Sequence, residues 1–213
     1  MEIKAFDDGI FGATTYLVFD KTSKEAFLVD MTSKSDEIKK IILDNNLNLK
    51  YILITHGHFD HVYELDKMKS YFPNAKVYLN SEDKALLSHV SEQCAMACVK
   101  AIEVPKIDVF FDDSLEEKSS LSIGSKEIKI IHTKGHSKGG TCYLIENTLF
   151  SGDTLFKGSI GRCDLFGGDF GEIEDSIKNK LFTLPPETTV YAGHGAKTTI
   201  GYEKLYNPYF GEN

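Results

Sequence analysis

A short apolar run that ends in a cluster of histidines constrains the fold of this chain more than any other feature. The run YILIT, residues 51–55, has the length and composition of a buried strand. The six residues after it, HGHFDH, contain three of the seven histidines in the chain and one aspartate. We therefore expect a fold that presents a ligand-rich segment at the end of a buried strand.

Strand and helix patterns alternate along both halves of the chain. Runs rich in β-branched and aromatic residues predict strands over residues 14–20, 25–30, 51–55, 75–79, 127–133, 141–147, 148–153 and 188–193. Amphipathic spacing predicts helices over residues 33–47, 61–72, 81–90 and 172–184. Ser33 and Ser35 are both candidates for the N-cap of the first of these helices. The alternation predicts a chain of the α/β or α+β class.

Residues 88–120 follow neither pattern clearly. The stretch CAMACVKAIEVP, residues 94–105, is compatible with a helix that continues from the one before it. The stretch after it has the composition of a loop and an edge strand with an acidic, solvated face. We interpret residues 88–120 as an insertion that covers a site.

The composition argues against several classes of partner. The formal net charge is −8, which disfavours binding to nucleic acid or to an anionic membrane surface. The chain contains no run of about twenty apolar residues, so we expect no membrane span. The N-terminal residues lack the pattern of a secretory signal, and the four cysteines form no C-x-x-C pair. We therefore expect a reduced, cytoplasmic protein, and the sequence does not indicate its oligomeric state.

The histidine cluster has the spacing of a metal site. Residues two apart in an extended segment point the same way, so His56 and His58 can share one ion. Asp60 and His61 fall where the helix predicted over residues 61–72 begins, and the positive end of the helix dipole favours a carboxylate there. Imidazole nitrogen and carboxylate oxygen together suit zinc, manganese or iron.

Three more candidate ligands follow predicted strands elsewhere in the chain. His136, Asp153 and His194 each lie just past an apolar strand run and beside a glycine. Strand ends are where a rigid scaffold presents functional groups on loops, and glycine lets the backbone turn tightly there. His89, inside a predicted helix, and His132, inside a predicted strand, are interpreted as structural or exposed.

These residues resemble the metallo-β-lactamase superfamily. THGHFDH has the T-H-x-H-x-D-H form of that superfamily, and GHS, SGDTLF and GHG follow in its order. Within the superfamily, GDTLFKGSIGRCDLFGGD, residues 152–169, resembles the glyoxalase II group of hydroxyacylglutathione hydrolases, especially its short bacterial members. The resemblance implies an αββα four-layer sandwich formed by a single domain over residues 1–213. The C-terminal helical domain that holds glutathione in glyoxalase II is expected to be absent.

The resemblance also assigns roles to individual residues. It implies two divalent metal ions, zinc first, with iron or manganese as alternatives. Three histidines would bind the first ion, one aspartate and two histidines the second, and a further aspartate would bridge them: His56, His58 and His136; Asp60, His61 and His194; and Asp153. Arg162 stands where the family places a basic residue beside the glutathione part of the substrate. Lys134, in TKGH, replaces the proline that is usual before the third histidine.

The expected activity is that of a metal-dependent hydrolase acting on a small molecule. A metal-bound hydroxide would attack a thioester such as a hydroxyacylglutathione, and Asp60 would orient that hydroxide as well as bind metal. Arg162 would hold a carboxylate of the substrate through paired hydrogen bonds. A thiolate leaving group needs little protonation, so the reaction requires no dedicated general acid.

Other functions within the same fold provide the alternatives. A persulfide dioxygenase would bind a single iron through two of the histidines and Asp153, and GHG at residues 193–195, in place of the A-H-D-Y usual there, favours the hydrolase. A non-catalytic metal-binding protein is a weaker alternative, because the ligand set is complete. Nuclease and β-lactamase activities fit less well, because the chain is acidic and GRCD resembles the thioesterase side of the superfamily.

Overall fold

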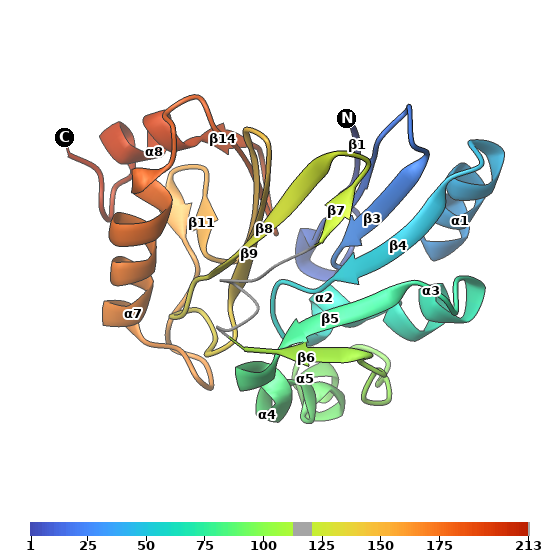
Figure 1. Ribbon diagram of the computed structural model, residues 1–213. Helices are drawn as coiled ribbons and strands as arrows, with labels where there is room; N and C mark the ends of the chain where they lie inside the picture. The colour runs from blue at the N-terminus through green and yellow to red at the C-terminus, as the bar shows by residue number, and fades with distance from the viewer. Residues whose placement is uncertain (113–120, 213) are drawn as a thin grey trace.

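The computed structural model describes residues 1–112 and 121–212, which form two facing β-sheets with helices on both outer sides (Figure 1). The first sheet comes from the N-terminal half of the chain and the second from the C-terminal half. The order of layers is helix, sheet, sheet, helix, which confirms the αββα sandwich expected from the sequence.

The first sheet contains, in spatial order, β1 (Glu2–Phe6), β2 (Thr15–Phe19), β3 (Glu25–Val29), β4 (Asn48–Leu53), β5 (Lys76–Asn80) and β6 (Val109–Phe111). Strands β1 to β3 pair antiparallel, and strands β3 to β6 pair parallel. The same half contains helices α1 (Ser35–Asp44), α2 (Phe59–Val62), α3 (Leu65–Tyr71), α4 (Lys84–Leu87) and α5 (Val90–Met96), with the short 3-10 helices η1 (Ile10–Gly12) and η2 (Ser81–Asp83).

The second sheet contains, in spatial order, β14 (Thr198–Thr199), β13 (Thr189–Ala192), β10 (Thr148–Gly152), β9 (Thr141–Ile145), β8 (Lys126–His132) and β7 (Ser122–Ile123). Its pairs are antiparallel except for β10 and β13, which run parallel. A separate hairpin consists of β11 (Leu155–Phe156) and β12 (Ser159–Ile160). The helical segments of this half are α7 (Phe170–Asp175), η3 (Ser176–Lys180), η4 (Leu181–Thr183) and α8 (Ile200–Tyr206).

Side chains that alternate along the strands divide the apolar interior into three cores. In β3, Phe27 points into the core between the two sheets, whereas Leu28 points into the core beneath the N-terminal helices. In β10, Phe150 joins the core between the sheets and Leu149 joins the core beneath the C-terminal helices. Strands that are buried on both faces consist of nearly continuous apolar runs, which is why these strands could be predicted from the sequence.

The strand predictions agree with the structure to within a few residues, but several helix predictions are wrong in detail. The helix predicted over residues 81–90 is divided into η2 and α4, and Val90 already belongs to α5. The N-cap of α1 is Lys34, in the left-handed conformation with φ 59°, rather than Ser33 or Ser35. The helix predicted over residues 61–72 is divided into α2 and α3. At the junction, the carboxylate of Glu64 accepts a hydrogen bond from the N–H of Ser35 at 2.8 Å. A tertiary contact therefore accounts for the start of α1 and accompanies the break between α2 and α3.

The segment that was hardest to interpret is described only in part. Helix α5 ends at Met96, and β6 pairs with β5 at the edge of the first sheet, which confirms the predicted edge strand. Residues 113–120, the last part of the segment over residues 88–120 that was predicted to cover a site, lie outside the described residues, and that cover stays a prediction. Within residues 1–112 and 121–212, none of the helices has the length and apolar character needed to cross a membrane.

Candidate metal centre

The candidate ligands lie at one edge of the sandwich, where strands of both sheets end. Strands β3 and β4 are parallel, so the residues that follow them meet, and the N–H of Thr55 donates to the carboxylate of Asp30 at 2.8 Å. Strands β10 and β13 are also parallel, and the N–H of Gly193 donates to the carbonyl of Gly152 at 2.8 Å. A hydrogen bond of 2.8 Å from the N–H of Thr141 to the carbonyl of Thr55 joins the two sheets here. The segments that follow β3, β4, β10 and β13 are far apart in the sequence but lie close together at this edge.

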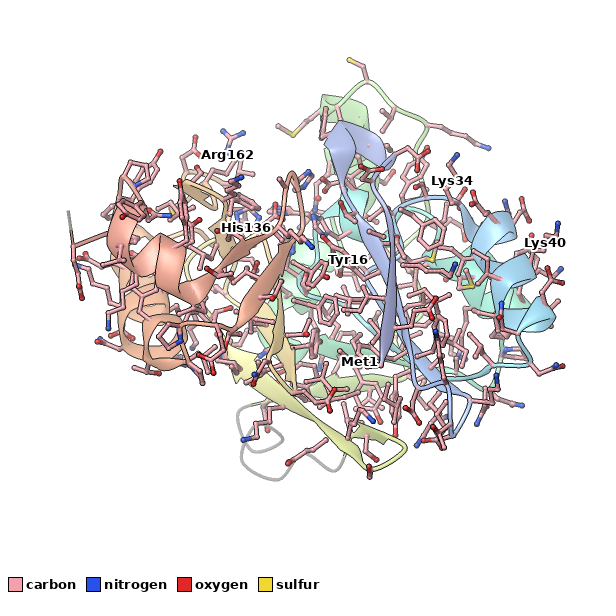
Figure 2. The ribbon with its side chains drawn as sticks, turned by 90° about the horizontal axis from the view of Figure 1, so that it is seen from above. Met1, Tyr16, Lys34, Lys40, His136 and Arg162 are labelled. Atoms are coloured by element: carbon pink, nitrogen blue, oxygen red, sulfur yellow. The ribbon has the colours of Figure 1, made fainter. Side chains whose placement is uncertain are left out.

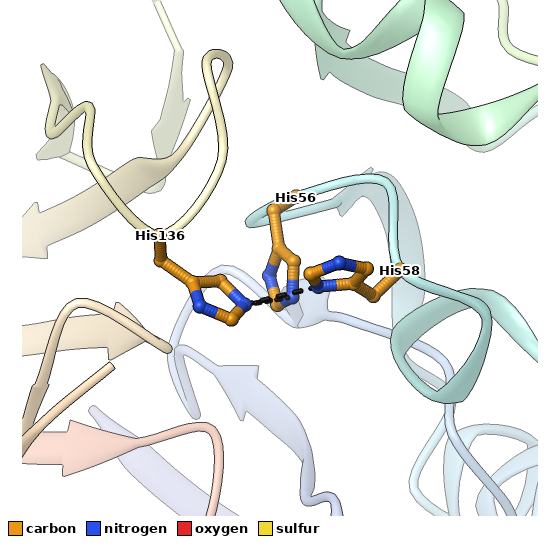
Figure 3. Close-up of side chains that lie close together, drawn as sticks. All are labelled: His56, His58 and His136. Atoms are coloured by element: carbon orange, nitrogen blue, oxygen red, sulfur yellow. Dashed lines mark hydrogen bonds between the residues drawn. The ribbon is translucent and has the colours of Figure 1, made fainter. Parts of the chain in front are cut away.

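Three histidines form what we call the first group: His56, His58 and His136 (Figure 3). The Nε2 atom of His136 lies 3.2 Å from Nε2 of His56 and 3.0 Å from Nδ1 of His58. All three residues are buried, with at most 8% of their surface exposed. Two of them follow β4 and the third follows β8, so the group joins the two halves of the chain.

Hydrogen bonds on the outer side of two of these rings fix which nitrogen carries the proton. The Nδ1 atom of His136 lies 2.8 Å from the carbonyl oxygen of Arg162, which can only accept. The Nδ1 atom of His56 lies 3.0 Å from the hydroxyl of Thr55, whose own proton is donated to Asp30. Both Nδ1 atoms therefore donate, and in the neutral rings the Nε2 atoms that face one another carry lone pairs.

One aspartate and two histidines form the second group: Asp60, His61 and His194. The Nε2 atom of His194 lies 3.3 Å from Nε2 of His61 and 3.5 Å from Oδ2 of Asp60. The Nδ1 atoms again point outward, that of His61 to Asp30 at 2.8 Å and that of His194 to the carbonyl of Phe11 at 3.1 Å. The side chain of His61 is fully buried, whereas that of His194 is 24% exposed. The second group is therefore open to solvent on one side.

Asp153 lies between the two groups. Its Oδ2 atom is 3.7 Å from Nε2 of His136 and 3.4 Å from Nε2 of His194. Its Oδ1 atom is buried and accepts no hydrogen bond from the residues that the structure describes, although Nε2 of His61 lies 3.4 Å away. A Cβ atom on Gly193 would lie 2.1 Å from this oxygen, so the close approach of the loop after β13 requires glycine. A buried carboxylate oxygen without a donor is costly unless a cation lies beside it.

The electrostatic environment of the two groups differs. Burial, reinforced by the charge of a neighbouring histidine, lowers the pKa of His58 to about 3. Burial also lowers the pKa of His56 well below its ordinary value. In the second group burial acts in the same direction, but hydrogen bonds to Asp153 and Asp60 outweigh it and raise the pKa of His194 to about 9. The rings of His56 and His58 are thus neutral nitrogen donors, whereas in the second group His194 carries a positive charge beside the carboxylates of Asp60 and Asp153.

The donor atoms fit divalent cations. Tetrahedral zinc at about 2.0 Å from each nitrogen separates its ligand atoms by about 3.3 Å. The facing nitrogens within the two groups lie 3.0–3.3 Å apart, close to that separation. Facing lone pairs and a buried oxygen without a donor are both stabilised by a cation placed between them. Zinc, iron and manganese all accept this combination of imidazole and carboxylate ligands.

The structure brings together all seven residues that the sequence suggested as ligands, and their binding of metal stays a prediction. Arg162 lies at the same edge as His136 (Figure 2). Its side chain is 61% exposed and forms a fork on the carboxylate of Asp164, with Nε and Nη2 at 2.7 and 2.8 Å from the two oxygens. Its predicted contact with substrate also stays a prediction. His89 is exposed, His132 is buried in β8, and neither belongs to the two groups.

Two buried aspartates that the sequence analysis did not single out also support the site. Asp30 accepts hydrogen bonds of 2.8 Å from the N–H and the hydroxyl of Thr55 and from Nδ1 of His61. It follows β3 as Asp153 follows β10, so the same strand-end argument would have identified it. Asp83 accepts hydrogen bonds from the loops that carry the first group, and no local sequence pattern marks it.

Comparison with known proteins places these features in a family context. A family model described as the metallo-beta-lactamase superfamily matches residues 8–194. Hydroxyacylglutathione hydrolase GloC from Haemophilus influenzae is 33% identical over 213 residues, which cover 98% of this chain and 98% of that protein.

Two solved structures are similar along almost the whole chain. BLEG-1 B3 metallo-beta-lactamase is 32% identical with a TM-score of 0.86, covering 98% of this chain and 99% of that chain. TTHA1623, solved in a di-iron-bound form, is 29% identical with a TM-score of 0.83, covering 97% of this chain and 100% of that chain. The likeness therefore extends far beyond the histidine cluster itself.

Proposed function

The chain belongs to the metallo-beta-lactamase superfamily, and from that premise we propose that it is a hydrolase that holds one divalent ion at the first group and another at the second. The observation that carries the proposal is the convergence of histidine nitrogens around one carboxylate. Facing Nε2 atoms lie 3.2 and 3.3 Å apart within the two groups, and Asp153 reaches both. Histidines whose other nitrogen is held by a fixed acceptor are the usual ligands of such ions.

The ions would supply chemistry that the side chains lack, because binding lowers the pKa of water from about 15.7 toward about 7 and makes hydroxide available at neutral pH. The side chains would bind and orient. Asp60 is 8% exposed and lies beside the partly open His194, where its carboxylate can accept a hydrogen bond from the attacking hydroxide and set its direction. Asp30 and the carbonyl of Phe11 hold the rings of the second group in orientation.

We propose a thioester of the hydroxyacylglutathione type as the substrate. The likeness to a protein named hydroxyacylglutathione hydrolase, along 98% of both chains, supports this choice. A thiol has a pKa near 8.5, so the thiolate leaves without a dedicated general acid. Arg162 would bind a carboxylate of the substrate, which would replace Asp164 on its guanidinium group.

Zinc is the ion we propose, with iron as the alternative supported by the di-iron form of a 29% identical structure. We also propose that residues 1–213 form a single domain. The core between the sheets supports this, because it contains residues from both halves of the chain, such as Phe27 and Tyr143. The cytoplasmic location stays a prediction.

The test combines metal analysis with an assay on S-D-lactoylglutathione in the same preparation. We expect about two ions per chain and hydrolysis of the thioester in the wild type, and fewer than two ions with a strongly reduced rate in Asp153→Ala. A protein with two ions that hydrolyses no thioester would overturn the proposed substrate. Oxygen consumption with glutathione persulfide would then indicate the dioxygenase, and hydrolysis of a chromogenic cephalosporin would indicate a β-lactamase.

A further inference from the structure

A buried carboxylate, that of Asp83, joins the two loops that carry the first group. Asp83 ends η2, and only 1% of its surface is exposed. Its Oδ2 atom accepts hydrogen bonds from the N–H of Gly57 at 2.9 Å and from the hydroxyl of Ser137 at 2.8 Å. Its Oδ1 atom accepts from the N–H of Gly139 at 2.7 Å. The three donors lie 26, 54 and 56 residues away in the sequence, so the carboxylate joins distant segments.

The donors stand directly beside the candidate ligands. Gly57 separates His56 from His58, and Ser137 follows His136. The hydrogen bonds of the carboxylate therefore fix the separation between the segment after β4 and the loop after β8. Across that separation the ligand nitrogens face each other at 3.0 and 3.2 Å.

The contact between Asp83 and the loop after β8 is tight. A Cβ atom on Gly139 would lie 2.7 Å from Cγ of Asp83 and 2.8 Å from its backbone nitrogen, so this approach requires glycine. An ion pair of 3.0 Å between Lys134 and Glu82 joins the same segments, but its side chains are 35% and 40% exposed. Exposed ion pairs contribute little, so the buried carboxylate is the stronger of these two links.

Helix capping does not account for this carboxylate. Asp83 occupies the N-cap position of α4, yet its side chain accepts no hydrogen bond from that helix. An N-cap aspartate normally accepts a hydrogen bond from the N–H of the second or third helical residue. Burial raises the pKa of Asp83 against the opposing effect of its three hydrogen bonds. The carboxylate is thus buried at some cost, and the three hydrogen bonds that it accepts come from the two loops.

We propose that Asp83 is a positioning residue for the first metal ion, setting the distance between the segment of His56 and His58 and the loop of His136. The inference rests on the proposed metal-dependent function. The second group is held by different contacts, to Asp30 and to the carbonyl of Phe11. Loss of the Asp83 carboxylate therefore weakens the first ion and leaves the second in place.

The metal-free protein provides the first readout. Asp83→Asn keeps the volume of the side chain but replaces one accepting oxygen with an amino group. We expect amide hydrogen exchange at Gly57 or Gly139 to become roughly tenfold faster or more, the factor for loss of a hydrogen bond to a charged acceptor. Asp20→Asn is the matched control, because Asp20 is also buried and accepts from the N–H of Ser23 at 2.9 Å, at the end of β2 away from the site.

Titration of the full chain with Co²⁺ alone provides the second readout. Visible absorption follows two binding steps, which His136→Ala and His194→Ala assign to the first and second groups. In Asp83→Asn we expect the dissociation constant of the first-group step to rise about 10- to 100-fold, the effect typical of residues that orient metal ligands. The second-group step, and both steps in Asp20→Asn, are expected to match the wild type.

Each outcome has a separate meaning. Equal weakening of both steps, or no change in either, overturns the role of Asp83. If the wild type binds no Co²⁺ at all, the proposed function fails, and the inference fails with it. If Asp83→Asn does not fold, Ser137→Ala removes one of the three hydrogen bonds and is expected to weaken the same step alone. An unchanged first step in that variant would overturn the inference.

Discussion

The first and second groups lie side by side, yet they are assembled in different ways. The first group consists of imidazoles alone, is buried, and has its two loops joined by the carboxylate of Asp83. The second group contains a carboxylate, is partly exposed at His194, and is held by Asp30. Asp153 faces both groups, with its side chain 3.4–3.7 Å from the nearest histidine nitrogen of each. Two ions in one site can therefore be tuned separately by residues that touch different loops.

Removal of the shared residue affects both groups and has the largest expected effect. In Asp153→Ala the carboxylate that faces His136 and His194 is lost. We expect kcat/KM for S-D-lactoylglutathione to fall by about 10³-fold or more, equivalent to ~4 kcal/mol of transition-state stabilisation. Metal analysis of the same preparation should show fewer than two ions per chain. Full metal content together with full activity would contradict the assignment.

Metal removal tests both groups without a substitution. A ligand that binds only the folded state adds about 2.7 kcal/mol at one hundred times its dissociation constant. In a chain of this size that corresponds to about 5–10 °C in Tm for each ion. We expect a chelator to lower the Tm of the wild type by that amount per ion and to leave Asp153→Ala less affected. An identical Tm with and without chelator would argue against bound metal.

Single ligand substitutions separate the groups. His136→Ala removes a nitrogen from the first group, and His194→Ala removes one from the second. We expect each variant to retain about one ion per chain. Its thioesterase activity should fall by about 10²-fold, the effect of losing one group that stabilises charge in the transition state. Metal analysis and steady-state rates provide the measurement. Loss of both ions in each variant would show that the groups are not independent.

Asp30→Asn is the counterpart of the Asp83 substitution. Asp30 accepts from Nδ1 of His61 at 2.8 Å and reaches His56 only through the hydroxyl of Thr55. We expect the second-group ion to bind about 10- to 100-fold more weakly and the first to change less. A Co²⁺ titration with assigned steps provides the measurement. A larger effect on the first step would reverse the comparison between the groups.

Arg162→Ala has the smallest expected effect, because the arginine side chain is 61% exposed and already paired with Asp164. If the guanidinium binds a substrate carboxylate, KM should rise by about 10-fold, the value of one charge-assisted hydrogen bond. The kcat and the metal content should stay unchanged, since only the carbonyl of Arg162 contacts a candidate ligand. Steady-state kinetics on S-D-lactoylglutathione provide the measurement, and an unchanged KM would remove Arg162 from the substrate site.

The candidate ligands could be predicted because residue types and spacings within short stretches of sequence indicate them. The ligands lie in short segments that follow apolar strand runs, and parallel strands such as β10 and β13 bring their ends to one edge. The same argument, applied to EAFLVD, would have identified Asp30. The strands were predictable because both of their faces are buried, which leaves continuous apolar runs in the sequence.

Features that depend on distant contacts were not predictable in this way. The N-cap of α1 is Lys34 rather than a serine, and the N–H of Ser35 donates to Glu64 at the junction of α2 and α3. Asp83 lies inside a helical pattern, and its donors come from loops up to 56 residues away. A short stretch of sequence does not indicate which distant residue will form a hydrogen bond with it, so these partners are seen only in the folded chain.

The most direct test of two separate ions in one site is a crystal structure with anomalous difference maps recorded at the absorption edge of the bound metal. The account predicts two peaks in each chain, one among the nitrogens of the first group and one among the donor atoms of the second group, with the carboxylate of Asp153 between them. A single peak away from both groups, or no peak in protein purified without chelator, would contradict it.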